Sequence, residues 1–487
     1  MAPLPEHLTL SGAPEGMDAA LVARELARGN PVIHIARDDR RMAAMRAALA
    51  FFAPAAAVLE FPAWDTTPYD RVSPAAGVMA ARMAVLTALA HGALKGPFVV
   101  LTTLSAAMQR VPAREVLRDA GFSAAVGDRM DEAALRAFLA RMGFSQAPTV
   151  TEPGDFAIRG GIIDIFPPGE SGPIRLDMFG DVLEGARRFD AETQRSVEKL
   201  DRIELAPMSE VILDEAAITR FRQNYRAEYG AAANDPLYEG ISAGRKMAGM
   251  EHWLPWFHER LESLFDYLPG ASLVADDHLD QVRDARWHTI TEQFDARREA
   301  LARKGGSDTV YRPVPPAGMF PDEAEWARWL AAHRLLRLSV LPQPLGPGVL
   351  DAGGRVGRNF APERQVEKGN LFRALADHIR NLQASRRVVI ASFSEGARER
   401  LAGLIADEGI KGAKPIADLR DLPDQPGALG LAVWPLEEGF TSDGSATGAL
   451  AVISEQDVLG DRLIRGAKKR RKAENFLTEA QSLSPGD

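Results

Sequence analysis

The sequence predicts an α/β fold with three parts: a doubly wound domain, an inserted α+β module with an antiparallel sheet, and a second small α/β domain. Strand and helix patterns alternate near the N-terminus, short strands with Pro and Gly turns follow, and a strand, turn and helix recur later. Alternating elements are typical of a parallel sheet with helices on both faces, whereas short strands between turns indicate an antiparallel sheet. The chain has 487 residues, too many for one hydrophobic core, so several domains are expected.

The first domain is expected to comprise residues 1–125 and, after an insertion, residues 207–320. Its alternation rests on two short β-branched runs and two Ala-rich stretches with helical spacing, namely "PVIHIA", "PFVVLTT", "DDRRMAAMRAALAFFA" and "GVMAARMAVLTALAHG". The later part adds a core-type strand in "ASLVADD". These elements predict a doubly wound sheet.

Residues 126–206 are expected to form the inserted α+β module. A helix within "MDEAALRAFLARMGF" precedes three strand-rich segments, "GDFAIRGGIIDIFPPG", "PIRLDMFGDVLEGARRFD" and "RIELAP". Gly160 and Gly161 lie between strand residues and lack the GxGxxG spacing. We therefore expect this pair to form a β-bulge rather than a dinucleotide-binding loop.

One strand of this module, "PIRLDMF", carries an unusual solvent face. Strand alternation separates two sets of side chains, Ile174, Leu176 and Met178 in the core and Arg175, Asp177 and Phe179 on the opposite face. If "FPPGESGP" is the hairpin connection, antiparallel pairing brings Arg159 within about one residue of Phe179. Two arginines around an exposed aromatic ring have the composition of a protein-binding hot spot. The alternative is an arginine stem that lies across Phe179 on an ordinary solvated face, and the pattern leaves both open.

Residues 325–460 are expected to form the second, smaller α/β domain, after the linker-like "PVPPAG". A strand, a turn and a helix follow one another in "RRVVIASFSEGARERLAGLIADEGI", and two further buried strands flank a loop before residue 460. Residues 461–487 are expected to be a basic linker. Its run at 462–472 holds seven Arg and Lys residues without an acid, which indicates either a solvated linker or a nucleic-acid contact.

A doubly wound domain raises the question of a phosphate-binding loop before its first long helix. The segment "LSGAPEGMDAAL" lies there and keeps Gly12 and Gly16, but Met17 and Asp18 stand where a P-loop needs lysine and a hydroxyl. The added carboxylate repels phosphate, so we predict a degenerate P-loop-NTPase-like domain that binds no nucleotide. Asp276 and Asp277 follow a strand where a metal-binding aspartate could lie, and we expect them instead at the start of a helix.

The composition excludes several other classes of site. Cysteine is absent, so disulfides, cysteine-ligated zinc and thiol catalysis are excluded, and the nine histidines show no metal-binding spacing. A net charge of −9 is unsuited to general polyanion binding. No apolar run approaches the roughly 20 residues of a membrane span, and the N-terminus lacks the regions of a signal peptide. We therefore expect a cytoplasmic protein with no metal site and no membrane partner.

Several segments resemble a known protein family. "EPGDFAIRGGIIDIFPPG" followed by "IRLDMFGDVLEGARRFDAETQRS" is similar to a module of UvrB and, more closely, to that of the bacterial transcription-repair coupling factors. Other similar segments lie at 61–89, 101–112 and 249–257. The segment "LAVWPLEEGF", followed by "ALAVISEQDVLGDR", resembles the next domain of the coupling factors, which UvrB lacks. The chain is thus identified as the N-terminal half of this family.

The resemblance implies a function in DNA repair. It implies that the inserted module docks the repair protein UvrA, with Arg159, Arg175 and Phe179 as contact residues. No catalytic residue, cofactor or metal is implied for this chain. RNA polymerase and DNA are expected to bind through further C-terminal domains, which include a translocase dependent on ATP and Mg²⁺. The alternative function is that of a nucleotide-dependent repair enzyme of the UvrB or helicase type, which requires the loop around Met17 to bind phosphate.

Overall fold

The computed structural model describes residues 7–230, 235–302, 311–365, 370–444 and 447–460. The chain divides into two compact units. The first unit consists of Met1–Arg355 with Asp418–Asp421 and Ser442–Ala449, and the second of Val356–Ala417, Leu422–Thr441 and Leu450–Asp487. No helix in the described ranges combines the length and the apolar character needed to cross a membrane.

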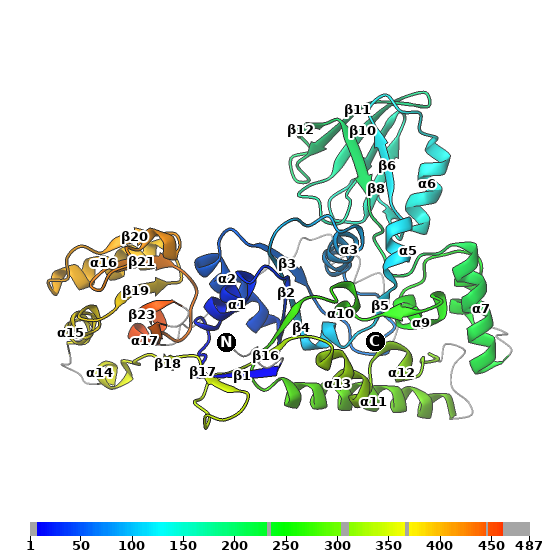
Figure 1. Ribbon diagram of the computed structural model, residues 1–487. Coiled ribbons are helices and arrows are strands. Elements are labelled where there is room, and N and C mark those ends of the chain that lie inside the picture. Colours follow the sequence, from blue (N-terminus) through cyan, green and yellow to red (C-terminus); the bar gives the residue numbers. More distant parts are fainter. Residues whose placement is uncertain (1–6, 231–234, 303–310, 366–369, 445–446, 461–487) are drawn as a thin grey trace, which may run out of the picture. The chain divides into compact units, whose positions relative to one another are not determined.

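A parallel seven-stranded sheet forms the centre of the first unit (Figure 1). Its strands follow the order β17-β1-β16-β15-β2-β4-β3, and the register of every neighbouring pair is parallel. The strands are β1 (His7–Ser11), β2 (Val32–Ala36), β3 (Ala57–Phe61), β4 (Phe98–Thr103), β15 (Ser272–Ala275), β16 (Leu335–Ser339) and β17 (Val349–Asp351). The predicted strands at 31–36 and 97–103 are therefore confirmed, as is the parallel sheet.

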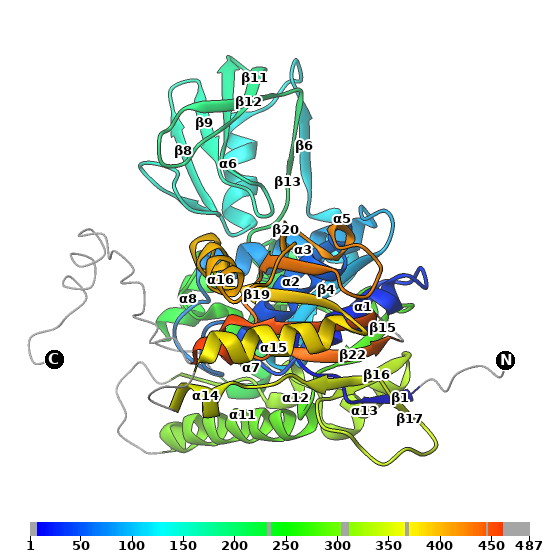
Figure 2. The ribbon, with the colours of Figure 1, turned by 90° about the vertical axis from the view of Figure 1, so that its left-hand side faces the viewer.

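Helices lie on both faces of this sheet, with α1 (Asp18–Leu26), α2 (Asp39–Phe52) and α3 (Ala76–His91) on one side and α11 (Leu279–Ala302), α12 (Pro316–Met319) and α13 (Glu323–Ala331) on the other (Figures 1 and 2). The remaining elements of this part are α4 (Leu104–Ala107), β5 (Val111–Pro112), α5 (Arg114–Asp119), α7 (Glu215–Tyr229), α8 (Pro236–Ser242), η1 (Met250–Trp253), α9 (Leu254–Phe257), β14 (Leu261–Glu262) and α10 (Leu264–Tyr267). Both Ala-rich segments are thus helices, as predicted.

The boundary between the units differs from the prediction. A domain that begins at residue 325 would contain α13, β16 and β17, yet β16 lies between β1 and β15 in the first sheet. The first unit therefore extends to Arg355. The segment "PVPPAG" has the composition of a linker, but its Val314 is buried and its Pro316 begins α12. Proline is accepted at the first turn of a helix, which explains the misreading.

The inserted module is a sheet with one helix, α6 (Glu132–Arg141), and the strands of the sheet are antiparallel except at its edge, where the first strand of the module pairs parallel with the second. The sheet has the strand order β12-β11-β10-β9-β8-β7. Its strands are β7 (Ser145–Gln146), β8 (Asp155–Arg159), β9 (Ile162–Ile165), β10 (Ile174–Phe179), β11 (Val182–Phe189) and β12 (Ser196–Leu200). The predicted strand in "RIELAP" is β13 (Arg202–Leu205), which pairs instead with β6 (Phe122–Ala125) in a separate two-stranded sheet.

The glycine pair is a reverse turn, so the predicted bulge is wrong at this position. Gly160 and Gly161 are the two residues between β8 and β9, which pair from Arg159 to Ile162. Gly160 has φ of 52°, a value that glycine adopts readily. A Cβ atom on Gly161 would lie 2.6 Å from the carbonyl oxygen of Met178, so the turn requires glycine to approach β10.

The register shift of this sheet lies in β11 instead. Asp177 pairs with Gly185 and the next residue, Met178, pairs with Leu183, which leaves Glu184 as the extra residue. A bulge in β11 keeps the alternation of β10 intact, because the extra residue is on the partner strand.

The module shares one hydrophobic core with the parallel sheet. Ile163, Ile165 and Leu176 of the module belong to the same buried cluster as Val100 and Leu273 of the parallel strands. A fully buried ion pair reinforces this packing: Arg82 Nε of α3 lies 2.6 Å from Glu210 Oε1, just beyond the end of the module. Arg82 also donates to the carbonyl oxygen of Pro62. The module is therefore fixed to its domain rather than tethered.

A second, six-stranded sheet has the order β18-β22-β23-β19-β21-β20, in which β23, β19, β21 and β20 are parallel. The elements of this part of the chain are β18 (Gly354–Val356), α14 (Ala361–Gln365), α15 (Leu371–Gln383), β19 (Arg387–Ser392), α16 (Glu395–Asp407), β20 (Lys414–Ile416), η2 (Leu419–Asp421), β21 (Leu429–Val433), β22 (Phe440–Gly444), β23 (Gly448–Ser454) and α17 (Glu455–Leu459). The predicted strand–turn–helix is β19 and α16. The predicted basic linker at 461–487, including its run at 462–472, lies outside the described residues.

Candidate functional site

The three residues singled out in the inserted module lie on one broad face of its sheet. Ile174 and Leu176 are buried, and Arg175 and Phe179 alternate with them, which confirms the predicted alternation along β10. Phe179 is 73% exposed, the largest exposed fraction of any large apolar side chain in the described residues. An aromatic ring in water at the end of a rigid strand has no packing role in this chain, and it is therefore a candidate contact residue.

A buried carboxylate organises the two arginines. Asp164 in β9 is 2% exposed and pairs directly with Arg175 across the strands. The Arg175 Nε and Nη2 atoms donate to the two oxygens of Asp164 over 2.7 and 2.9 Å, a bidentate arrangement. The hydrogen bond to Asp164 raises the pKa of Arg175 above its ordinary value. Arg159 in β8 approaches the same carboxylate, with Nη2 at 4.0 Å from Oδ2.

The two arginines differ in exposure and in how closely they are paired. The Arg175 guanidinium carbon lies 4.6 Å from the centroid of the Phe189 ring, and only 20% of the side chain is exposed. Arg175 is thus enclosed between a carboxylate and an aromatic ring. The Arg159 side chain is 56% exposed and lies beyond hydrogen-bonding distance of Asp164, so it can turn towards a partner.

The structure corrects the predicted neighbourhood of Arg159. "FPPGESGP" does connect two paired strands, because Ile165 pairs with Ile174. The glycine turn, however, pairs β8 with β9 rather than with β10, so that Arg159 lies opposite Ile162. The alternative of an arginine stem across Phe179 is wrong for Arg175, which stacks on Phe189 and leaves Phe179 in solvent.

Asp164 is the residue that sequence reasoning missed. It lies in the apolar run "GIIDIFP", where a carboxylate in a buried strand requires a cationic partner. That signal was present, but the partner could be found only through the register of three strands. The sequence pattern that indicates such a site is a single acidic residue in an apolar strand, with arginines in the neighbouring strands at positions that pair with it or lie next to it.

Protein side chains fill the loop between β1 and α1, where the sequence predicted a degenerate phosphate loop. Gly12 and Gly16 have φ of 68° and 92°, and Met17 is fully buried. The Asp18 carboxylate accepts the Gly16 N–H over 3.0 Å and forms a buried ion pair with Arg41. A carboxylate thus satisfies a loop amide that a P-loop would offer to phosphate.

A second acid completes this buried network. Asp276 Oδ1 lies 3.3 Å from Arg41 Nε, and Asp276 Oδ2 accepts from Arg37. The expectation that Asp276 begins a helix is therefore wrong, because α11 starts at Leu279 and Asp276 serves as a counter-ion. Asp277 accepts the backbone N–H of Val340 instead.

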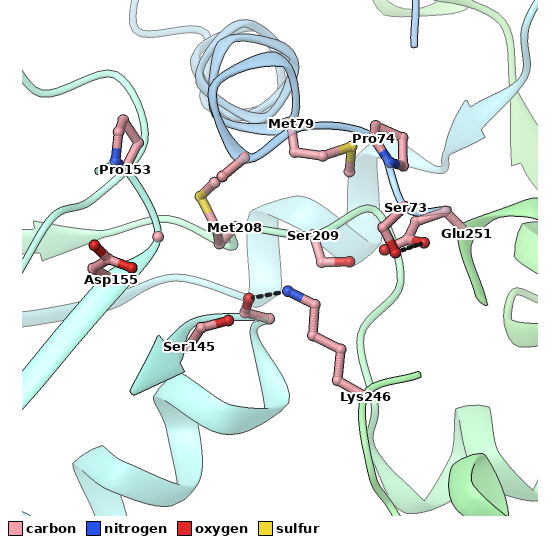
Figure 3. A pocket seen from close by; sticks show the side chains of 13 residues that line it. Ser73, Pro74, Met79, Ser145, Pro153, Asp155, Met208, Ser209, Lys246 and Glu251 are labelled. Atoms are coloured by element: carbon pink, nitrogen blue, oxygen red, sulfur yellow. Dashed lines mark hydrogen bonds between the residues drawn. The ribbon is translucent and has the colours of Figure 1, made fainter. Parts of the chain in front are cut away.

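A small cavity of about 100 Å³ lies where the module meets its domain (Figure 3). Lys246 Nζ donates to the Gly143 carbonyl oxygen over 2.9 Å, and the Ser73 hydroxyl donates to Glu251 over 2.7 Å. Glu251 is almost fully buried, and this burial raises its pKa. These hydrogen bonds use the polar side chains of the lining to hold neighbouring segments of the chain together, so the lining has a structural role. In the residues that the structure describes, no group of three acidic or histidine side chains is placed to hold a metal ion.

Two family models match parts of the chain. The UvrB interaction domain matches residues 122–211, the range that includes β6 to β13, and the D3 domain of MFD matches residues 382–458. The candidate face therefore lies within a segment with a recognised counterpart.

Curated relatives match over nearly the whole chain. The chain is 30% identical over 486 residues to the transcription-repair-coupling factor of Escherichia coli K12, covering 98% of this chain and 40% of the relative. The same-named proteins of Haemophilus influenzae (28% over 490 residues, 98% and 40%) and Myxococcus xanthus (30% over 488 residues, 94% and 39%) are also similar. The chain spans about two fifths of the length of the relatives it matches.

We predict that Arg175→Ala lowers the free energy of unfolding by about 3–5 kcal/mol, because it leaves the buried Asp164 carboxylate without its bidentate partner. Urea denaturation followed by circular dichroism measures this loss. The double variant Arg175→Met with Asp164→Leu removes both charges and should recover most of the stability. A single variant as stable as the unsubstituted chain would contradict the importance of this pair.

We predict that Glu251→Gln increases the free energy of unfolding at neutral pH. Since the pKa of Glu251 is raised in the folded state, the carboxyl contributes stability at pH below its ordinary pKa, and this contribution is lost as pH rises through the folded-state value. The amide keeps an acceptor for Ser73 and does not ionise. Urea denaturation at about pH 5 and about pH 8 should show a smaller decline for the variant than for the unsubstituted chain. A variant less stable at about pH 8 would show instead that the ionised carboxylate is needed.

Proposed function

We propose that this chain, which belongs to the family of the transcription-repair-coupling factors and covers their N-terminal part, recruits the nucleotide excision repair protein UvrA. The recruiting surface is the face of the antiparallel sheet that carries Arg159, Arg175 and Phe179. The observation that carries the proposal is the exposure of Phe179 on the same face as Arg159 and as Arg175, which Asp164 holds in place, within the match to the UvrB interaction domain.

The physical character of this face supports protein binding. Aromatic and arginine side chains dominate the energetics of protein interfaces, above all where they are held on a rigid element. Arg175 is already fixed between Asp164 and Phe189, so its ordering adds little entropic cost when a partner binds. Phe179 would fill an apolar pocket of UvrA, and Arg159 would form a charge-assisted hydrogen bond with a UvrA carboxylate.

We infer the wider role from the same family membership. In the full-length protein, further domains would bind RNA polymerase and DNA and use ATP with Mg²⁺ to translocate along DNA, so that a polymerase stalled at a lesion is displaced and the site is passed to repair. The present chain would act in the cytoplasm, without a cofactor, metal or catalytic residue of its own.

The first unit is further proposed to be a degenerate P-loop-NTPase-like domain. A parallel sheet with a glycine-containing loop between β1 and α1 supports the relationship, and the Asp18–Arg41 pair in that loop supports the loss of nucleotide binding. The alternative function, a nucleotide-dependent enzyme of the UvrB or helicase type, would need phosphate where these two side chains meet.

The substitution Phe179→Ala is predicted to weaken UvrA binding by at least about 30-fold, since an anchor residue of an interface contributes about 2 kcal/mol or more. Titration calorimetry with purified UvrA measures the dissociation constant. The fold should be unaffected, because the ring is 73% exposed.

Val197→Ala is the matched control for this experiment. Val197 is 71% exposed and lies in β12 of the same sheet. β12 pairs with one end of β11, at Ala186–Phe189, whereas Phe179 pairs with Val182 at the other end of that strand. Its truncation should leave the affinity unchanged. UvrA binding that is undiminished in Phe179→Ala would refute the assigned face.

Calorimetry with ATP and Mg²⁺ separates the proposed function from its enzymatic alternative. We expect no binding by this chain up to about millimolar ATP, because Asp18 holds the loop amide of Gly16 and its negative charge opposes phosphate. A dissociation constant in the micromolar range would favour the enzyme instead.

A further inference from the structure

We propose that Ile162 is a second apolar anchor of the recruiting face, so that the partner presents an apolar cleft for two side chains rather than a pocket for one. This inference rests on the proposed function and adds a specificity-determining residue to it. The partner surface that fits is an apolar cleft with a carboxylate at the edge that meets Arg159.

The first argument is the exposure of Ile162. It follows the glycine turn at the start of β9 and is 41% exposed, although the next residue of the strand, Ile163, is fully buried. A β-branched aliphatic side chain in a strand stabilises the fold when it is buried, and the Ile162 side chain is only partly buried. Exposed large apolar side chains are few in the described residues, and two of them, Ile162 and Phe179, lie in this turn region.

The second argument is the register of the strands. Ile162 is opposite Asp177 in β10, and Phe179 lies two residues beyond Asp177. Directly opposite residues share a face of the sheet, as do residues two apart in one strand, so Ile162 and Phe179 point to the same side. They are diagonal neighbours, a relation in which Cα atoms are roughly 7–8 Å apart and an aromatic side chain can reach its neighbour.

Charged side chains surround this apolar pair. Arg159 flanks Ile162 on one side and Asp177 on the other, and Arg187 Nη2 donates to Asp177 over 2.8 Å. An apolar centre within a charged rim is the anatomy of a protein–protein interface, in which the rim excludes water from the centre. Arg159 is an exposed cation of this rim, and a carboxylate of the partner complements it.

The glycine turn holds both anchors in a fixed relation. The Ile162 N–H donates to the Gly160 carbonyl oxygen over 2.6 Å, and the Met178 N–H donates to Gly161 over 2.7 Å. Because Phe179 follows Met178, the two hydrogen bonds to this one turn fix the backbone at Ile162 and next to Phe179. A pre-organised pair loses little freedom on binding, which favours a cleft that accepts both.

The test compares Ile162→Ala with the unsubstituted chain by titration calorimetry against purified UvrA. We expect a loss of affinity of about tenfold, since truncating a large apolar anchor at an interface costs more than about 1 kcal/mol. Ile162→Thr keeps the branched shape but adds a hydroxyl, and it should give a smaller loss. Val197→Ala is again the matched control, because it truncates an exposed β-branched residue of the same sheet.

A double-mutant cycle adds a second readout. The combined variant Ile162→Ala with Phe179→Ala should lose less than the sum of the two single losses, because both side chains share one cleft. Unfolding midpoints of all variants show that folding is retained. Unchanged affinity in Ile162→Ala, together with weakened binding in Phe179→Ala, would overturn this inference and leave the proposed function standing. Unchanged affinity in both single variants would overturn both.

Discussion

The buried carboxylate of Asp164 is the constraint on which the interaction face depends. An acid removed from water in the middle of a sheet must be paired, and the strands on either side each supply an arginine. Because Arg175 donates to both Asp164 oxygens, its side chain is held against the sheet. Arg159, by contrast, is 56% exposed and lies 4.0 Å from the same carboxylate. One buried charge thereby separates two similar side chains into one that is enclosed and one that is open to solvent.

The position of the module depends on a second buried charge pair. Arg82 and Glu210 are both inaccessible to solvent, and the Arg82 guanidinium carbon also lies 4.2 Å from the centroid of the Phe61 ring. This pair joins α3 of the parallel-sheet domain to the segment that leaves the module. Together with the shared core, it supports the proposed recruiting face, so that a partner would meet a preformed surface and little reorganisation would be required.

Local pattern predicted the elements and much of the face, and long-range pairing decided the rest. Periodicity located β2, β4, α2 and α3 because each carries its signal within its own residues. The alternation in β10 separated Arg175 and Phe179 from the core for the same reason. The glycine pair was ambiguous, since a bulge and a turn use the same residues and differ only in what pairs beyond them. The partners of Asp164 depend on the register of three neighbouring strands, and the place of β16 depends on strands distant in sequence, so the pattern within one strand identifies neither.

The buried ion pairs around Arg41 have a consequence for how the chain can change. Asp18 and Asp276 both lie against the Arg41 guanidinium, so replacing Arg41 would leave the buried Asp18 carboxylate without its cation. A phosphate-binding site at this loop would need a lysine, a hydroxyl and the removal of Asp18 together. Removing Asp18 alone would take a counter-ion from the buried Arg41 guanidinium, so a single substitution towards phosphate binding is expected to lower the stability of the domain.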